Sequence, residues 1–356
     1  MSLISYKCPN CGGELVFDPD SGKYSCPFCQ SFFTQEEIDA LTPKSGSEAA
    51  SSDEEAAGEA GEAKTEGKAV VYSCPSCGGE IVTDETTAAT FCYYCHNPVV
   101  MEGKVSGDFL PDKIIPFKIG RESAVKKFLD YTSRKIFVPR AFFNAEQIDR
   151  LTGVYYPYWV YDSDVDGEIS GTATKLRVWR VGDTEYTETS RYHVSRSGRI
   201  SMGNLTRNAL RKTDRQLVEN VQPFELSGAE DFSMGYLSGF VAEKRDMEKE
   251  EFARALTDEC SGYASKLLEE TISGYSTVHI DNRNLKKIRE HFSYMLLPVW
   301  VLTYRSKAGK MYYYAMNGQT GQIYGELPLD RKRVAIFGAI VFAVVSIIAM
   351  IVGYMM

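Results

Sequence analysis

The strongest hydrophobic pattern of the chain lies between Val334 and Gly353. These twenty residues carry no charge and one hydroxyl side chain, Ser346. At ~1.5 Å per residue, a helix of this length crosses roughly the 30 Å hydrocarbon layer of a membrane. A buried core helix is the alternative, but the segment is apolar on every side and long. The pattern therefore predicts one transmembrane helix at 334–353.

Three basic residues, Arg331, Lys332 and Arg333, come directly before this span. Positive charge beside a span favours the cytoplasmic side. We therefore expect a single-pass, tail-anchored protein of the cell membrane with the bulk of the chain in the cytoplasm. Ala335, Ala339 and Ala343 recur every four residues, which would allow close packing with a membrane-helix partner or within a homo-oligomer.

Residues 104–329 have the pattern of an α+β domain with an antiparallel sheet. Apolar residues follow helical spacing in two segments, 121–135 and 247–272. Strand-like patterns occupy 153–161, 175–181, 187–195, 277–280, 295–304 and 310–316.

Two local patterns add detail to this domain. Asn317-Gly318, in "AMNGQTGQIYGE", predicts a hairpin turn with positive φ angles at these two residues. "YYPYWVYD" (155–162) and "LLPVWVLT" (296–303) share proline, tryptophan and valine at the same spacing. This echo indicates two related halves, with chance similarity as the alternative.

The N-terminal part repeats one phrase, "YKCPNCGGELVF" at 6–17 and "YSCPSCGGEIVT" at 72–83. In both copies a second CxxC pair follows after fourteen residues, and each cysteine of the second copy lies 66 positions after its counterpart. Two CxxC turns joined by a hairpin form a tetrahedral cage of four sulfurs. The predicted ligands are Cys8, Cys11, Cys26 and Cys29 in one cage and Cys74, Cys77, Cys92 and Cys95 in the other.

We interpret these segments as two small β zinc ribbons, rubredoxin-like, at 1–42 and 70–103, each with one Zn²⁺ ion. Iron in the same geometry is the chemical alternative. Gly12 and Gly78 follow the first pair of each module and favour the tight turn.

Two further residues have alternative roles. His96, next to Cys95, is an alternative ligand. Cys260 lies in a helical pattern and is expected to be a small buried residue, with a regulatory thiol as the alternative.

The segment 43–69 is predicted to be a flexible acidic linker. Between Lys44 and Lys68 it has seven acidic residues, three lysines and no aromatic or branched aliphatic residue. It cannot bury enough apolar surface to offset the entropy of ordering.

Charge and composition narrow the function. The net charge is −8, which argues against nucleic acid as the main partner. Cysteines in CxxC pairs without a leader sequence favour metal thiolates in a reducing compartment over disulfides.

The basic segments at 207–215 and 283–290 would each present a stripe of positive charge if they were helical. Such a stripe would be either a solvated face or a contact surface for anionic lipid. We find no hydrolase, phosphate-loop or dinucleotide motif, so we expect no catalytic residues and no enzyme.

The two CPxCGG ribbons, "LPVWVLTY", "YAMNGQTGQIYGELP" and the C-terminal span together resemble a bacterial family, the TFIIB-type zinc-ribbon-containing membrane proteins. This resemblance implies that the eight cysteines bind zinc. It also implies a non-enzymatic adaptor for envelope-stress proteins in Gram-positive bacteria, with phage-shock-protein-A-like coat proteins and flotillin-like (SPFH) proteins as partners. Cys92-Tyr93-Tyr94-Cys95-His96 departs from the family pattern because it lacks the usual proline and glycine.

The leading hypothesis is a tail-anchored membrane adaptor or scaffold whose ribbons dock cytoplasmic proteins. Two alternatives stay open. One is a membrane-tethered nucleic-acid-binding protein, since zinc ribbons serve that role in transcription and replication factors. The other is a thiol or zinc redox sensor in which oxidation releases the metal.

Overall fold

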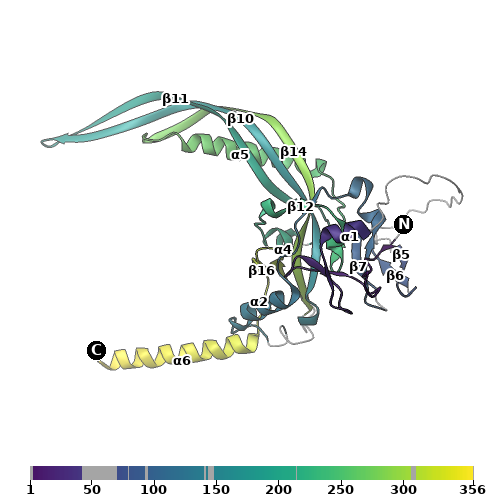
Figure 1. Cartoon of the computed structure of the whole chain (residues 1–356). Helices are drawn as coiled ribbons and strands as arrows, with labels where there is room; N and C mark the ends of the chain where they lie inside the picture. Colours follow the sequence, from purple (N-terminus) through teal and green to yellow (C-terminus); the bar gives the residue numbers. More distant parts are fainter. Residues whose placement is uncertain are drawn as a thin grey trace, which may run out of the picture. The chain divides into compact units, whose positions relative to one another are not determined.

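The computed structural model describes residues 3–41, 70–78, 80–92, 95–139, 142, 148–213, 215–305 and 310–355. The predicted linker at 43–69 lies outside them. The chain forms two compact units (Figure 1). The first unit comprises Met1–Pro157, Leu210–Arg245 and Leu296–Met356, and the second comprises Tyr158–Ala209 and Asp246–Met295. The domain boundaries expected from sequence divide the chain differently and stay predictions.

One large sheet dominates the fold, so the chain is a sheet-rich protein. Its strand order is β1-β8-β7-β13-β10-β14-β15-β16, and β11, β9 and β12 pair alongside this path. Pairing is antiparallel between β10 and β11 and between β14 and β15, and parallel between β10 and β13. The strands are β1 (Leu3–Ile4), β7 (Thr87–Phe91), β8 (Pro98–Met101), β9 (Lys113–Ile114), β10 (Thr152–Val181), β11 (Thr184–Asn208), β12 (Glu230–Asp231), β13 (Val241–Glu243), β14 (Thr277–Arg305), β15 (Met311–Asn317) and β16 (Ile323–Gly325).

The two predicted helices are confirmed as α2 (Arg121–Ser133) and α5 (Glu250–Glu270). A long C-terminal helix, α6 (Arg331–Met355), covers the predicted span. The shorter helices are α1 (Gln35–Leu41), α4 (Arg215–Glu219), η1 (Glu102–Lys104), η2 (Gly107–Phe109), η4 (Leu226–Gly228) and η5 (Met234–Leu237).

An aromatic cluster forms the centre of the first unit. Phe117 stacks on Phe240 with ring centroids 4.3 Å apart, and it makes edge contacts with Tyr155 and Trp300. The indole of Trp300 donates a hydrogen bond to the carbonyl of Ile119, at 3.0 Å. Because Ile119 lies just before α2, this bond places the start of the helix against the sheet.

The second unit packs α5 on one face of β10 and β11. Leu268 and Ile272, at the end of the helix, lie in a cluster with Ile169, Ala173 and Val194. The indole of Trp159 donates to the carbonyl of Met247, at 2.9 Å, just before α5. The tryptophans of the two echoing segments therefore make the same kind of contact, although the duplication itself stays a prediction.

The predicted strands at 153–161 and 175–181 are parts of one strand, β10. Between them buried and solvent-facing positions alternate with a period of two. Gly171 stands at a buried position where the backbone of β14 passes closely, since a Cβ there would lie 2.0 Å from the carbonyl oxygen of His279. Because glycine weakens the sequence pattern of a strand, the pattern did not predict that this strand is continuous.

The expected strands at 277–280 and 295–304 likewise join as β14. Two consequences correct the sequence analysis. The basic segment 283–290 lies in this strand and forms no helix. The basic segment 207–215 forms no continuous helix either, because Arg207 and Asn208 end β11.

The hairpin between β15 and β16 is confirmed, but its turn chemistry is not the predicted one. Positive φ falls on Gly321, at 81°, and not on Asn317 or Gly318. The buried amide of Asn317 instead donates to the carbonyls of Val221 and Pro223. Gly318 is needed for close packing, because a Cβ there would lie 2.4 Å from the ring of Phe117.

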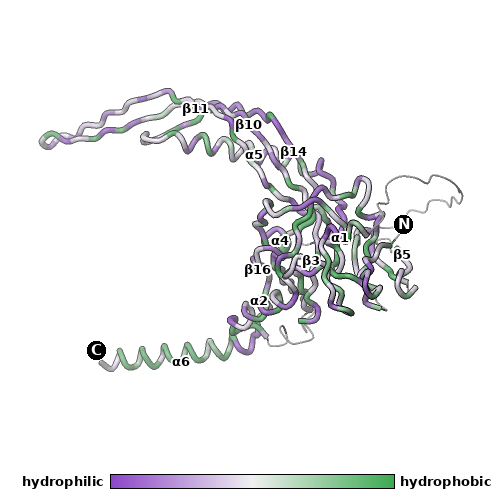
Figure 2. Tube along the Cα trace, in the orientation of Figure 1, coloured by the Kyte–Doolittle hydropathy of each residue, from purple (hydrophilic) through white to green (hydrophobic). Residues whose placement is uncertain are grey.

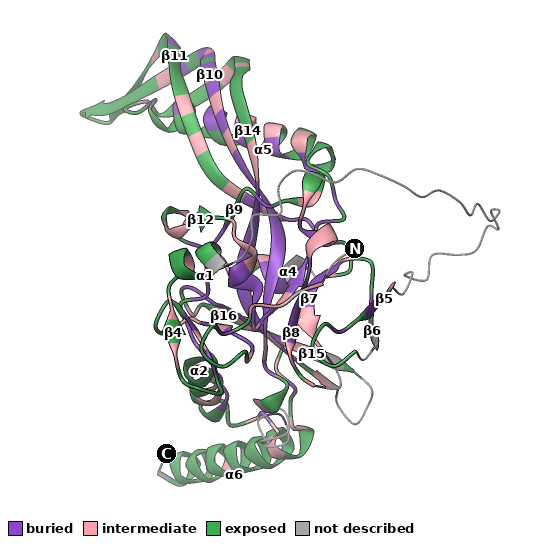
Figure 3. Ribbon diagram, turned by 45° about the vertical axis from the view of Figure 1, so that its right-hand side comes forward, coloured by how far each residue is buried: buried purple, intermediate pink, exposed green. Residues whose placement is uncertain are grey.

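Helix α6 exposes its apolar side chains around its whole circumference (Figures 2 and 3). Its first turn is fixed to the first unit. The carboxylate of Asp330 accepts from the amides of Lys332 and Arg333 and caps the helix. The guanidinium of Arg333 donates to the carbonyls of Ile136 and Val138.

Candidate metal centres

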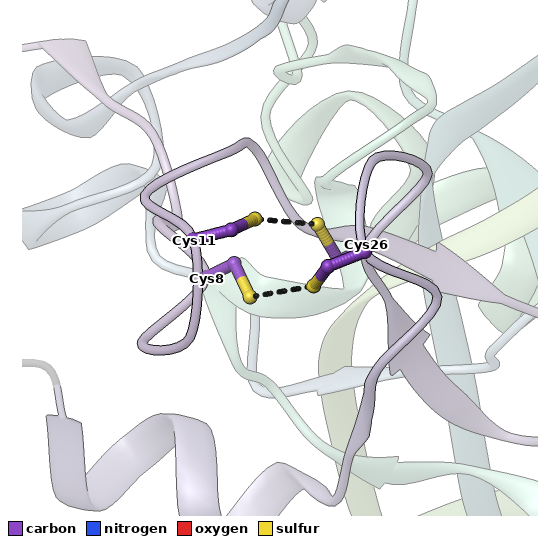
Figure 4. Close-up of side chains that lie close together, drawn as sticks. Cys8, Cys11 and Cys26 are labelled. Carbon is purple, nitrogen blue, oxygen red and sulfur yellow. Dashed lines mark hydrogen bonds between the residues drawn. The ribbon is translucent and has the colours of Figure 1, made fainter.

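The first ribbon (residues 6–41) brings its four cysteines together. Its three-stranded sheet consists of β2 (Val16–Asp18), β3 (Lys23–Ser25) and β4 (Phe32–Phe33). The sulfurs of Cys8 and Cys29 lie 3.5 Å apart, as do those of Cys11 and Cys26 (Figure 4). All four sulfurs lie within 4.8 Å of one another.

The second ribbon (residues 70–101) repeats this arrangement. Its first CxxC pair lies between β5 (Val70–Ser73) and β6 (Glu80–Thr83), and its second pair lies between β7 and β8. The sulfurs of Cys74 and Cys95 are 3.7 Å apart, and so are those of Cys77 and Cys92. The structure thus gathers the eight predicted cysteines into two clusters.

Both clusters fit a closed zinc site. Tetrahedral coordination with Zn–S bonds of about 2.3 Å separates neighbouring sulfurs by about 3.8 Å, close to the distances in both cages. All donors are thiols, and none is joined in a disulfide. Four sulfurs in each cage leave no open position for a substrate. The two clusters are therefore suitable for zinc binding.

Crowding makes the thiols of the first cage inequivalent. Hydrogen bonds with the side chain and backbone of Ser31 lower the pKa of Cys29 to about 6. The backbone amide of Gly13 lowers the pKa of Cys11, but hydrogen bonds with Cys29 and Cys26, together with desolvation, outweigh it and raise the pKa to about 12. A shared cation would offset the repulsion between four thiolates in this cage.

The four CxxC turns share one backbone design. In each, the amide of the residue after the pair donates to the carbonyl of the first cysteine, and that residue takes a left-handed conformation. These residues are Gly12, Gln30, Gly78 and His96, with φ between 58° and 73°. His96 thus occupies the turn position that Gln30 takes in the first ribbon, and it lies outside the four-sulfur cluster.

The second half of the second ribbon, β7 and β8, is part of the main sheet. Strand β7 pairs with β13, through Ala89 and Ala242, and β8 pairs with β1. Lys212 reinforces this junction, since its ammonium lies 2.6 Å from Asp84 and 2.9 Å from Glu243. Burial opposes ionisation of Asp84, but hydrogen bonds from Lys212 and Thr87 outweigh it and hold its pKa below the usual range. Burial raises the pKa of Glu243.

The first ribbon is attached to the body of the first unit through β2. The amide of Phe17 donates to the carbonyl of Ser238, at 3.1 Å, and the hydroxyl of Ser238 donates to the carbonyl of Leu15. The ring of Phe17 makes an edge contact with Tyr236. The ribbon therefore has a fixed position within this unit.

One carboxylate joins the two ribbons. Glu14, which is 3% exposed, accepts from Lys7 at 2.5 Å, from the hydroxyl of Ser76 at 2.5 Å and from the amide of Asn97 at 3.2 Å. Ser76 lies inside the first CxxC turn of the second ribbon, and Asn97 follows its second turn. Glu14 therefore contacts both turns that form the second cage.

Sequence reasoning missed Glu14, Ser76 and Asn97. One sign was available, because a glutamate follows the double glycine in both copies of the repeated phrase.

The structure bears on whether Cys260 is a core residue or a regulatory thiol. Its side chain is buried in α5, where burial raises the pKa of the thiol. This agrees with a small core residue.

Comparison with known proteins agrees with this geometry. Residues 6–42 match the family model described as TFIIB zinc-binding, so the chain carries a TFIIB-type zinc ribbon. It is also 30% identical over 333 residues to the "Uncharacterized protein YdjG" of Bacillus subtilis (strain 168). The alignment covers 94% of this chain and 92% of that protein. The chain therefore belongs to the YdjG family. No solved structure matches it.

We predict that each cage binds its own ion. Cys8→Ser and Cys74→Ser should each lower the zinc content of the purified protein from two ions to one, as measured by elemental analysis. Cys74→Ser should also lower the unfolding temperature more than Cys8→Ser, because the second ribbon contributes strands to the main sheet. Two retained ions in either variant, or equal unfolding temperatures, would contradict this assignment.

We predict that Glu14 couples the ribbons. Glu14→Ala leaves Lys7, Ser76 and Asn97 without their shared acceptor, which should cost about 1–3 kcal/mol of stability. Metal transfer from the protein to a chelator should be faster than in wild type, as followed by the absorbance of the chelator. The control is Glu36→Ala, at an exposed carboxylate of the same ribbon. Equal transfer rates in both variants would rule out the coupling.

Proposed function

We propose that this protein is a single-pass, membrane-anchored zinc-binding adaptor. Helix α6 crosses the cell membrane, the rest of the chain lies in the cytoplasm, and the ribbons dock other proteins. The observation that carries this proposal is the exposure of the apolar stretch of α6. None of its apolar stretch, within Arg331–Tyr354, is buried by the other described residues.

Membrane insertion accounts for this exposure. Soluble proteins rarely expose continuous apolar surfaces of this size, whereas lipid is the natural solvent for a helix that is apolar all round. Arg331, Lys332 and Arg333 precede the span and favour the cytoplasmic side. Because the carbonyls of Ile136 and Val138 bind Arg333, the first unit starts at the membrane surface.

The ribbons supply structure rather than catalysis in this proposal. Zinc suits a closed four-thiolate site, since such sites stabilise small folds and activate no water. An apolar surface of the first ribbon supports docking. Phe28 is 69% exposed and Phe32 is 55% exposed, and both belong to the segment that forms the second half of the cage. Large exposed aromatic side chains are frequent anchors of protein interfaces.

The resemblance to zinc-ribbon membrane proteins supports two classes of partner. They are coat proteins of the phage-shock-protein-A type and flotillin-like (SPFH) proteins, which would place the adaptor in envelope-stress or membrane-organisation assemblies. The search for partners needs point substitutions. Deletion of residues 1–100 would remove β1 and β7 and most of β8 from the main sheet, so lost binding would not report on docking.

We predict that α6 holds the protein in the membrane. A chain truncated after Arg333 should move from the membrane fraction to the soluble fraction of lysed cells, whereas Ile340→Leu, which keeps the span apolar, should stay with the membrane. Protease added outside intact spheroplasts should leave the bulk of the full chain uncut. Digestion of the bulk under those conditions would place it on the opposite side.

We predict that the exposed aromatic residues of the first ribbon bind partners. Phe28→Ser with Phe32→Ser should greatly reduce recovery of partner proteins from solubilised membranes, at unchanged zinc content. The matched control is Leu110→Ser, at another exposed apolar position of the first unit. Undiminished recovery by the double variant, measured by quantitative mass spectrometry, would refute docking through this surface.

A further inference from the structure

Strand β11 is an edge strand of unusual length. It covers Thr184–Asn208 and, within the part of the chain that the structure describes, pairs with β10 alone. Its pairing with β10 is regular from Ser163↔Met202 to Val181↔Thr184. Natural proteins usually protect long edges with bulges, prolines or covering segments. Between Thr184 and Ile200, β11 has no proline and no break in register, so this edge remains suited to accept another strand.

The charges along this strand are complementary to themselves. Two identical strands pair antiparallel about a twofold axis, and each residue then lies opposite its mirror position. When the axis passes through Tyr192, Glu185 lies opposite Arg199, because both are seven positions from Tyr192. Glu188 lies opposite Arg196, because both are four positions from it. Symmetry makes each of these two attractive pairs occur twice.

Ion pairs between β10 and β11 within each copy would continue the charge contacts that form between the two copies. Arg180 on β10 lies 3.4 Å from Glu185, and Asp166 on β10 lies 2.9 Å from Arg199. Both pairs are cross-strand neighbours in the β10–β11 register. A joined sheet would therefore contain a row of Asp166, Arg199, Glu185 and Arg180 with alternating sign, the last two from the second copy. Opposite charges on adjacent strands stabilise a sheet.

Other registers are less favourable. Shifting the pairing by two positions in one direction places Arg191 opposite Arg191. Shifting it by two in the other direction places Glu185 opposite Ser201 and leaves no acid opposite an arginine. The positions between the charges are mostly short, which permits close strand approach. They include Thr187, Thr189, Ser190, Ser195, Ser197 and Gly198.

We propose that β11 is a homotypic docking edge, through which two copies of this chain join their sheets antiparallel about Tyr192. Main-chain hydrogen bonds along the free edge supply the affinity, and the Glu–Arg pairs select the register. The inference concerns the second unit alone and does not depend on zinc binding or on membrane insertion.

Charge reversal tests this pairing in the full chain, solubilised in detergent with zinc present. One variant carries Glu185→Lys and Glu188→Lys, and the other carries Arg196→Glu and Arg199→Glu. The wild type should sediment as a dimer. Each variant alone should dimerise at least tenfold more weakly, because like charges then face each other. An equimolar mixture should form dimers again, since the two variants are complementary.

Three results of this experiment would overturn the proposal. They are a monomeric wild type, undiminished dimers of either variant alone, and a mixture that stays monomeric. Undiminished dimers would point to another contact, such as α6. If the charges along β11 serve only to keep the strand soluble, the wild type will be monomeric.

Cysteine cross-linking tests the register independently. Residues directly opposite in an antiparallel ladder have Cα atoms about 4.5–5.5 Å apart, within the range that a disulfide spans. Tyr192→Cys should therefore give a covalent dimer under mild oxidation. Thr187→Cys alone should not, but it should cross-link to Ser197→Cys in a mixture. Cross-linking of Thr187→Cys to itself, with none at position 192, would refute the register.

Discussion

Four thiols in a space less than 5 Å across impose the constraint around which the first unit is built. Their negative charges repel one another unless a cation is shared, so the turns carrying them are stable together only with metal bound. In the second cage one of these turns connects β7 and β8, which continue into the main sheet, and the other connects β5 and β6, which form a separate two-stranded sheet. A metal ion bound in this cage would therefore also stabilise the hydrogen bonds of β7 with β13 and of β8 with β1.

The ribbons consequently do not behave as two independent modules on a flexible tether. Glu14 fastens one to the other, and Phe17 and Ser238 fasten the first to the body of the unit. The surface with Phe28 and Phe32 therefore belongs to a ribbon that these contacts attach to the first unit.

Local spacing was sufficient to predict the cysteine clusters, the two main helices and the long apolar helix. Each depends on residues close in sequence, such as the CxxC pairs or the helical period of 121–135. Long-range pairing was beyond reach, because nothing near Thr87 identifies Val241–Glu243 as its neighbour. The single strands β10 and β14 were missed for another reason. The middle section of β10 carries glycine and aspartate, and that of β14 carries asparagine, lysine and glutamate, all of which are depleted in strands.

The difference between short and long pairing distances also sets an order for assembly during synthesis. The ligands of each cage lie within 21 residues of one another, whereas β7 must wait about 150 residues for β13. Closing a short loop costs far less chain entropy than closing a long one. During synthesis, the four cysteines of the second cage therefore leave the ribosome long before β13 does. The hairpin of β7 and β8 can therefore be complete before β13 is available to pair with it.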